Sequence, residues 1–188
     1  ILPIQLNALV FQSFSQLLLT AEEIKYASRL LRSMTGDTVP SVRAAAARAC
    51  GVTCDPYFID TLEARLQDPS TLVRKCAVLA LGYIHDARAT TLVTNSLKAD
   101  DPEVRQSAVR SLRLSSTPDS LRALRTSVSD SDERVRLSAI NALAAVARPE
   151  ALDGIAETLN DPSGTVRMTA VLALKKISSS QPLSPVGA

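Results

Sequence analysis

The dipeptide Val-Arg recurs at a constant interval of 31 residues, and this periodicity constrains the fold more than any other feature of the sequence. The copies are Val42-Arg43, Val73-Arg74, Val104-Arg105, Val135-Arg136 and Val166-Arg167. An alanine follows each arginine by three positions, and a leucine or Cys50 follows it by seven. Self-similarity at a fixed period is the signature of a repeat architecture, so the chain is one structural unit written several times.

Each repeat begins with a predicted helix. Val73, Ala77 and Leu81 follow the i, i+4, i+8 spacing that places side chains on one helix face. The alanines are small enough to let a neighbouring helix approach closely. Gly51 and the segment 148–149 stand where such helices should end, because Gly and Pro favour turns.

The second half of each repeat predicts another helix. Its apolar residues stay in register from repeat to repeat, as in Leu62, Val93, Leu124 and Ile155. Asp-Pro or Asp-Ser pairs then precede the next repeat, where the aspartate is expected to cap the following helix. No strand pattern occurs, so each repeat is predicted to be an antiparallel helix pair. One pair cannot bury its own apolar face, so the pairs must stack.

The repeats are predicted to occupy residues 37–177. Their bounds are 37–67, 68–98, 99–129, 130–160 and a partial repeat at 161–177. Residues 1–36 are expected to form a divergent N-terminal helix pair, a cap or junction that Gly36 closes. Residues 178–188, which contain Pro185 and Gly187, predict a flexible tail. The chain is expected to be part of a larger protein or complex.

The segment DPSTLVRKCAVLALG at residues 68–82 carries a family resemblance. It resembles the short HEAT repeats of the phycobilisome-lyase-like type, and the resemblance covers residues 37–177. The resemblance implies an all-α solenoid, a right-handed superhelix of stacked antiparallel helix pairs. First helices would lie on its convex surface and second helices would line its concave surface. Such a fold serves many activities and implies none in particular.

An arginine and an aspartate at fixed positions of the repeats predict a structural ladder. A guanidinium group has five donors in a planar fork and can bridge two repeats through carboxylate and carbonyl oxygens. The same inter-repeat pairing is implied by the family resemblance. Ala99 alone interrupts the aspartate column. The ladder residues are Asp37, Arg43, Asp68, Arg74, Arg105, Asp130, Arg136, Asp161 and Arg167.

No set of residues predicts catalysis or a cofactor. His85 is the single histidine, and no phosphate-binding glycine loop or nucleophile motif occurs. Cys50, Cys54 and Cys76 match no zinc pattern, and their odd number in core columns favours reduced thiols in the cytoplasm. We therefore expect no metal and no enzymatic activity.

Composition bears on the partners that the chain can have. Lys and Arg number 21 against 19 Asp and Glu, a net charge of +2, which argues against nucleic acid as a ligand. No run reaches the ~18 consecutive apolar residues of a membrane span. The opening segment lacks the basic leader of a signal peptide.

The outward positions of the second helices vary while the core columns stay constant. That contrast predicts a non-enzymatic scaffold or adaptor that binds a protein or peptide on its concave face. An arginine cluster would anchor an acidic peptide or phosphate, and an exposed aromatic would add contact area. The candidate partner-binding residues are Tyr57, Arg110, Arg113, Arg122 and Arg125. A nucleic-acid-binding solenoid and a bilin lyase-like enzyme subunit are the alternatives, and an open terminal repeat allows self-association.

Overall fold

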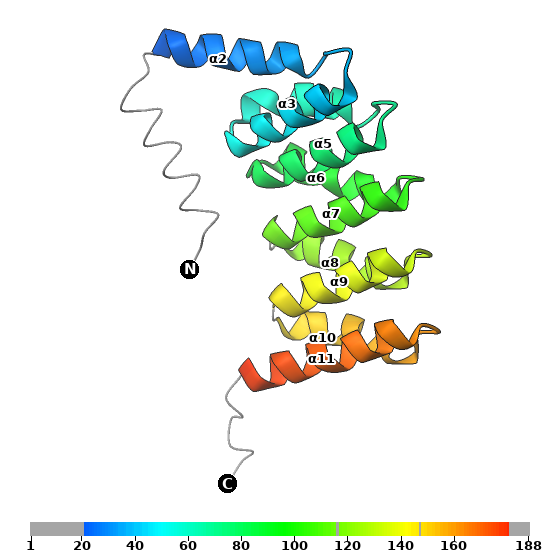
Figure 1. Cartoon of the computed structure of the whole chain (residues 1–188). Coiled ribbons are helices and arrows are strands. Elements are labelled where there is room, and N and C mark those ends of the chain that lie inside the picture. Colours follow the sequence, from blue (N-terminus) through cyan, green and yellow to red (C-terminus); the bar gives the residue numbers. More distant parts are fainter. Residues whose placement is uncertain (1–20, 116, 147, 181–188) are drawn as a thin grey trace. The chain divides into compact units, whose positions relative to one another are not determined.

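Every regular element of the computed structural model is a helix (Figure 1). The structure describes residues 21–115, 117–146 and 148–180, and no strand occurs among them. The all-α solenoid of stacked helix pairs is thereby confirmed, whereas the handedness of its superhelix stays a prediction. The described helices form two compact units, which divide between Leu92 and Val93.

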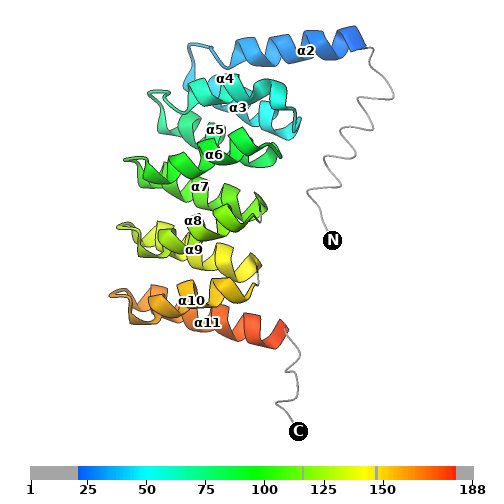
Figure 2. The same ribbon diagram turned by 180° about the vertical axis from the view of Figure 1, so that it is seen from behind.

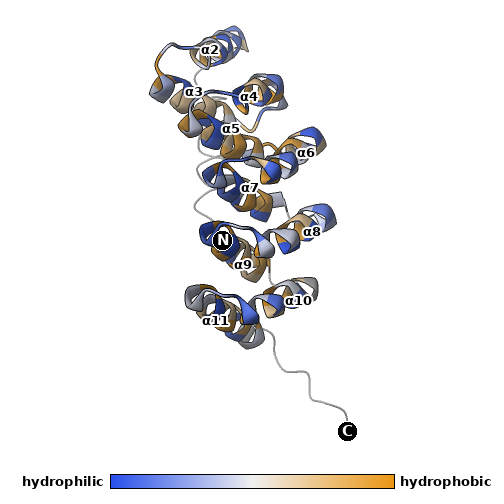
Figure 3. Cartoon of the chain, turned by 90° about the vertical axis from the view of Figure 1, so that its right-hand side faces the viewer, coloured by the Kyte–Doolittle hydropathy of each residue, from blue (hydrophilic) through white to orange (hydrophobic). Residues whose placement is uncertain are grey.

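In its described part, the first unit contains the pair α3 and α4, the helix α5 with the start of its partner, and a preceding helix. Its elements are α2 (Ala21–Met34), α3 (Pro40–Val52), η1 (Pro56–Phe58), α4 (Ile59–Arg65), α5 (Thr71–Tyr83) and the start of α6 (Ala87–Asn95). Helix α3 packs on α5 along one layer, and α2 packs on α3. Helix α4 lies beside α5 in a second layer (Figure 3).

The second unit repeats this arrangement. Its elements are the end of α6, η2 (Ser96–Lys98), α7 (Pro102–Ser115), α8 (Pro118–Thr126), η3 (Ser127–Ser129), α9 (Glu133–Val146), α10 (Pro149–Glu157), η4 (Thr158–Asn160) and α11 (Gly164–Ser180). Helices α7, α9 and α11 form its first-helix layer, and α8 and α10 form its second-helix layer (Figure 3). Figure 2 shows these helices following one below another in chain order. Each layer is thus made of equivalent helices from successive repeats.

The core consists of the columns that the sequence predicts. In the first helices Ala77, Ala108, Ala139 and Ala170 are completely buried. In the second helices Leu62, Val93, Leu124 and Ile155 are at most 1% exposed. Alanines in the helix contacts keep the axes close, and longer side chains fill the space between the two layers.

The predicted helix cap is one position where structure and expectation differ. Helix α5 begins at Thr71 with Ser70 at its N-cap, so Asp68 lies before the cap. The Asp68 Oδ1 atom accepts a hydrogen bond from the Ser70 amide at 3.0 Å. The aspartate therefore shapes the turn that leads into the helix, because its side chain accepts a hydrogen bond from the backbone two residues further on, as in an Asx-turn. Asp130 and Asp161 make the same contact with Asp132 and Ser163.

Gly51 does not end a helix, contrary to the prediction. Helix α3 continues to Val52, and Gly51 lies inside it, facing α5. A β-carbon at Gly51 would lie 2.5 Å from the Cα atom of Ala80, closer than atoms can approach. The glycine is required because the backbones of α3 and α5 nearly touch at this point.

The C-terminal boundary also differs from the prediction. Helix α11 runs through Ser180, past the expected start of a flexible tail at residue 178. Ile177 is 4% exposed, and the Ser178 hydroxyl donates to the Lys175 carbonyl at 2.8 Å, so the helix keeps its partners there. The rest of the predicted tail and the first helix of the predicted N-terminal pair lie outside the described residues.

Replacing Gly51 with alanine tests the close approach of α3 and α5. We expect Gly51→Ala to lower the free energy of unfolding by about 2 kcal/mol or more, because overpacking outweighs the better helix propensity of alanine. The control is Gly164→Ala in α11, where the added carbon would lie 3.7 Å from Arg167 Nη2, an ordinary contact. Equal urea midpoints for the two variants would contradict the packing argument.

Candidate functional site

The Arg105 side chain joins two successive repeats of the second unit. Its Nε and Nη2 atoms donate to the Asp130 carboxylate at 2.8 and 2.9 Å. Its Nη1 atom donates to the carbonyl oxygens of Ala99 and Asp100, both at 2.9 Å. The guanidinium thus holds the carboxylate of the next repeat and the entry turn of its own repeat.

The same geometry recurs in both units. In the first unit Arg43 donates to Asp68 at 2.7 and 2.8 Å, and to the Asp37 carbonyl at 2.8 Å. In the second unit Arg136 donates to Asp161 at 2.8 and 3.0 Å. These bidentate pairs are the strong form of a charged hydrogen bond, and they fix the separation of neighbouring repeats.

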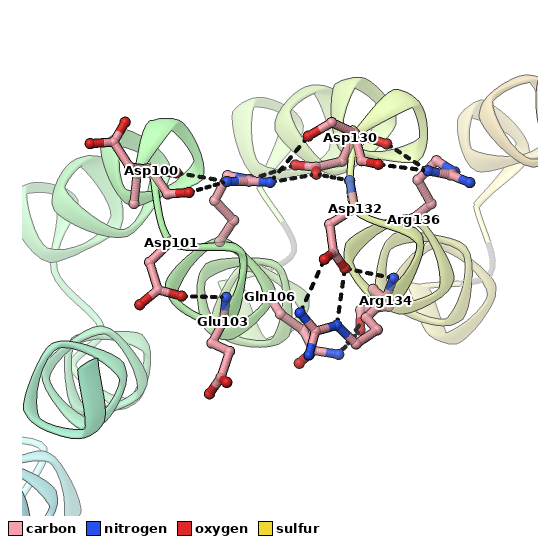
Figure 4. Close-up of polar contacts among 12 residues, drawn as sticks. Asp100, Asp101, Glu103, Gln106, Asp130, Asp132, Arg134 and Arg136 are labelled. Atoms are coloured by element: carbon pink, nitrogen blue, oxygen red, sulfur yellow. Dashed lines mark hydrogen bonds and ion pairs between the residues drawn. The ribbon is translucent and has the colours of Figure 1, made fainter.

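Each ladder aspartate also contacts the arginine of its own repeat. The Asp130 carbonyl accepts from Arg136 at 2.9 Å while its carboxylate accepts from Arg105, so Asp130 lies between two guanidinium groups (Figure 4). Asp68 and Asp161 likewise accept through their carbonyls from Arg74 and Arg167, at 2.9 and 2.7 Å. Arginine and aspartate therefore alternate along the edge of each unit.

The pairing changes the pKa values of the ladder carboxylates. The hydrogen bond from Arg43 lowers the pKa of Asp68, and the Ser70 amide lowers it further, against the opposing effect of burial. Burial is the largest influence on the pKa of Asp130 and raises it, but the hydrogen bonds from Arg105 and the Asp132 amide, together with the charge of Arg105, outweigh burial and lower the pKa. Burial likewise raises the pKa of Asp161, but the hydrogen bonds from Arg136 and the Ser163 amide and the nearby arginine charges lower it overall. The carboxylates are thus held in their charged form.

The cysteines lie in protected positions and show no ligand geometry. Cys50 and Cys76 are buried and Cys54 is half-buried, all as free thiols. Burial raises the pKa of Cys50 to about 11, which leaves it a thiol rather than a reactive thiolate. Among the described residues no group of three or more His, Cys, Asp and Glu side chains lies close enough to hold a metal ion. His85 is exposed.

Tyr57 lies in η1, where α2 approaches. Its ring meets Phe58 edge-on with the centroids 5.2 Å apart, and the guanidinium carbon of Arg32 lies 5.8 Å above it. Phe58 is completely buried, whereas Tyr57 is 48% exposed. Tyr57 therefore helps to hold α2 in the first unit and still presents half of its surface to solvent.

The four candidate arginines do not form one cluster. Arg110 and Arg113 lie on α7 in the first-helix layer, beside Ser138 and Asn141 of α9. Arg122 and Arg125 lie on α8 in the second-helix layer. The prediction of one arginine cluster is therefore wrong, because the turn between α7 and α8 places these two helices in different layers.

Arg125 is committed to contacts with α10. Its guanidinium lies 3.9 Å from Glu157 Oε1, and its stem covers Gly154, where a β-carbon would lie 3.1 Å from Arg125 Cγ. Arg122 is free of such packing: its side chain is 79% exposed, and its only polar contact within the described part of the chain is a long hydrogen bond of 3.3 Å to Asp119. Arg122 is thus the more accessible of the two.

A groove of about 440 Å³ runs along α8 in the second unit. We call it the α8 groove. Leu97 and Ala123 supply apolar surface, and Lys98 and Arg122 supply positive charge. The sequence predicts no site residue in the 3₁₀ turn that carries Leu97 and Lys98, because such a turn leaves no periodic signal. The remaining lining residues are Thr94, Asp119, Thr126, Ser127 and Asp130.

Helix α11 presents an apolar surface. Met168, Val171 and Leu172 are 60%, 55% and 58% exposed. Ile140, which occupies the position of Val171 in the preceding repeat, is completely buried. In the part of the chain that the structure describes, no helix has the length and apolar character needed to cross a membrane.

Comparison with known proteins identifies the repeats. The family model described as HEAT repeats matches residues 27–113, 59–140 and 121–186, which together span most of the chain. A search of curated proteins gave no match. Among solved structures, a chain of the CpcE–CpcF complex of the phycocyanin lyase from Nostoc is similar at 21% identity and a TM-score of 0.63. That match covers 81% of this chain and 65% of the lyase chain.

Two further structures share the fold. The protein YibA of E. coli is 19% identical with a TM-score of 0.65, over 83% of this chain and 63% of YibA. A designed armadillo repeat protein in complex with the peptide (KR)4 is 18% identical with a TM-score of 0.54, over 78% of this chain and 80% of the design. At these identities the similarity concerns the fold alone.

Removing Arg105 tests the ladder. We expect Arg105→Ala to lower the free energy of unfolding by about 2 kcal/mol, because it leaves the nearly buried Asp130 carboxylate without the guanidinium group that pairs with it. Arg122→Ala removes an exposed pair and should cost no more than about 0.5 kcal/mol. Urea unfolding of both variants makes the comparison, and equal midpoints would show that the ladder contributes no stability.

Acidification should weaken the same interactions. Because the folded-state pKa of Asp68 is lowered, its stabilising effect is complete above the unfolded-state value of about 3.9 and is lost as the pH falls through the folded-state value. We expect Asp68→Asn to flatten the decline of unfolding free energy below pH ~4, measured by urea titration across pH. Asp153→Asn, on the exposed side of α10, is the control. A decline as steep as in the parent chain would contradict the assignment.

Proposed function

This chain belongs to the HEAT-repeat family, and on that premise we propose that it is a non-enzymatic scaffold that binds a protein or peptide on its second-helix layer. The α8 groove carries the proposal. It combines apolar surface from Leu97 and Ala123 with charge from Lys98 and Arg122. None of these four side chains belongs to the ladder or is fully buried in the core.

The charges around the α8 groove favour an acidic or mixed polypeptide segment. Asp130 is held by Arg105, and Asp119 accepts only the long hydrogen bond from Arg122. No hydrogen bond or ion pair joins the Lys98 ammonium group to another described residue, so its charge is open to a ligand. Apolar floor with a charged rim is the usual anatomy of a protein interface.

Stacking makes such a groove effective. The ladder and the packed first helices hold α8 in place before a ligand arrives, so little conformational entropy is lost on binding. Two structural neighbours are consistent with this role: one is a chain of the CpcE–CpcF complex, and another is a designed armadillo protein in complex with a peptide. The present chain spans 65% of that lyase chain, so its own partner is a matter for experiment.

Two alternatives have weaker support. A nucleic-acid-binding solenoid would use the arginine rows, but three of these arginines hold an aspartate of the next repeat and the net charge is only +2. An enzyme subunit would need a reactive group, and the described thiols are protected or raised in pKa. Buried thiols also fit the proposed cytoplasmic location, where cysteines stay reduced.

Self-association through a terminal repeat stays a prediction. Met168, Val171 and Leu172 of α11 supply the apolar surface that it requires. In a repeat protein this is the surface against which a further repeat would pack.

Charge reversal in the α8 groove tests the proposed function. We expect the Lys98→Glu/Arg122→Glu variant to bind a captured protein at least about tenfold more weakly than the parent chain, because two rim charges change sign. Partners captured after nuclease treatment are purified, and their affinity is measured by calorimetry. The control is Arg148→Glu/Lys175→Glu, which reverses two exposed charges of the same unit outside the groove. Undiminished affinity in the first variant, or capture that nuclease abolishes, would refute the proposal.

A further inference from the structure

We infer that Arg110 and Arg113 form a second binding site, on the first-helix layer, for a phosphate monoester carried by a partner polypeptide. The site is a groove of about 240 Å³ between α7 and α9, lined by Arg110, Arg113, Ser138, Asn141 and Ala142. We call it the α7–α9 groove. It shares no residue with the α8 groove and does not depend on the proposed function.

The two arginines lie on the same side of α7. Residues three apart on a helix are neighbours on its surface, so both guanidinium groups reach the same opening. Both side chains are exposed. No hydrogen bond or ion pair joins either of them to another residue in the described part of the chain. By contrast, Arg105, Arg134 and Arg136 of the same unit each hold an aspartate.

Helix α9 supplies the opposite wall in a fixed position. The Gln106 side-chain amide donates to Ser138 Oγ at 2.9 Å and to the Arg134 carbonyl at 3.3 Å, which ties α7 to α9 beside the groove. Ser138 accepts in this contact, so its own hydroxyl proton remains available to a ligand. Asn141 adds an exposed amide donor, and the buried Ala142 forms the floor.

The donor set matches a phosphate monoester better than a carboxylate. Two guanidinium forks, one hydroxyl and one amide offer more N–H and O–H groups than two carboxylate oxygens can accept. A phosphate monoester presents three acceptor oxygens and a charge of about −1.5 to −2 at pH 7, which two arginines balance. Arginine forks are also the usual partners of phosphate in protein recognition.

The lining favours a phosphorylated polypeptide over a nucleic acid. Proteins that bind single strands combine phosphate contacts with aromatic surfaces on which bases stack, and no aromatic side chain lines this groove. The groove also has two cations in one place rather than a track of them. A single phosphate on a flexible chain meets both conditions.

The test uses a capped pentapeptide, Gly-Gly-phosphoserine-Gly-Gly, titrated into the ¹⁵N-labelled chain and followed by NMR. We expect shifts at the Asn141 side-chain amide and the Ser138 amide, and none with the unphosphorylated peptide. Arg110→Gln/Arg113→Gln should weaken binding at least about tenfold, since each removes a charged hydrogen-bond donor. Arg110→Lys/Arg113→Lys should weaken it less, because charge is kept and the forks are lost.

Control variants and a second probe distinguish binding in the α7–α9 groove from binding elsewhere, and a phosphopeptide from a nucleic acid. Arg148→Gln/Lys175→Gln removes the same charge elsewhere in the unit and should leave binding unchanged. Phosphopeptide binding that is lost in Lys98→Gln/Arg122→Gln instead would move the phosphate to the α8 groove and overturn the inference. A single-stranded oligonucleotide that shifts Asn141 more strongly than the phosphopeptide would overturn it in favour of nucleic acid. Absence of any shift at Asn141 would also overturn it.

Discussion

A helix pair of this length has an apolar face that only another pair can cover, and the rest of the structure depends on that constraint. Ile140 is completely buried, whereas Val171, at the same position one repeat later, is 55% exposed in α11. Both side chains are apolar, so the difference in exposure comes from whether another helix covers the position. Stability therefore comes from contacts between repeats, as expected when each unit touches only its neighbours.

The arginine–aspartate ladder fixes the alignment of neighbouring repeats, which apolar burial alone does not. Packing of alanines would tolerate some sliding of one helix on the next, since the hydrophobic effect is not directional. The bidentate contact between Arg105 and Asp130 allows much less freedom, because both donors and both acceptors must stay aligned. Its contacts with the carbonyls of Ala99 and Asp100 extend the same order to the entry turn. A held register is what allows grooves on either layer to keep their shape.

The buried positions are predictable from the sequence where the same repeat position meets the same surroundings in every repeat. The columns of Ala139 and Leu124 are core residues because the same spacing recurs in every repeat. Gly51 is predicted to end a helix, but it lies inside α3 and permits the close contact with Ala80, which depends on the packing of α3 on α5. The predicted grouping of Arg110 with Arg122 is also wrong, since these residues are close in the sequence but lie in different layers. The sequence does not predict that Lys98 lines a groove with Arg122, because the 3₁₀ turn at the end of the second helix leaves no periodic signal.

The sequence by itself determined the helical repeats, their length, the family and the residues that stack, because these follow from periodicity and local chemistry. Only the tertiary structure decided which arginines are committed and which remain open to a ligand. Arg105 and Arg110 are five residues apart on one helix, yet the first holds Asp130 and the second lines a groove. The physical reason is that a side chain's role depends on the acceptors that a neighbouring repeat brings within about 3 Å of it. That distance is set by packing between repeats and not by the residues beside it in the chain.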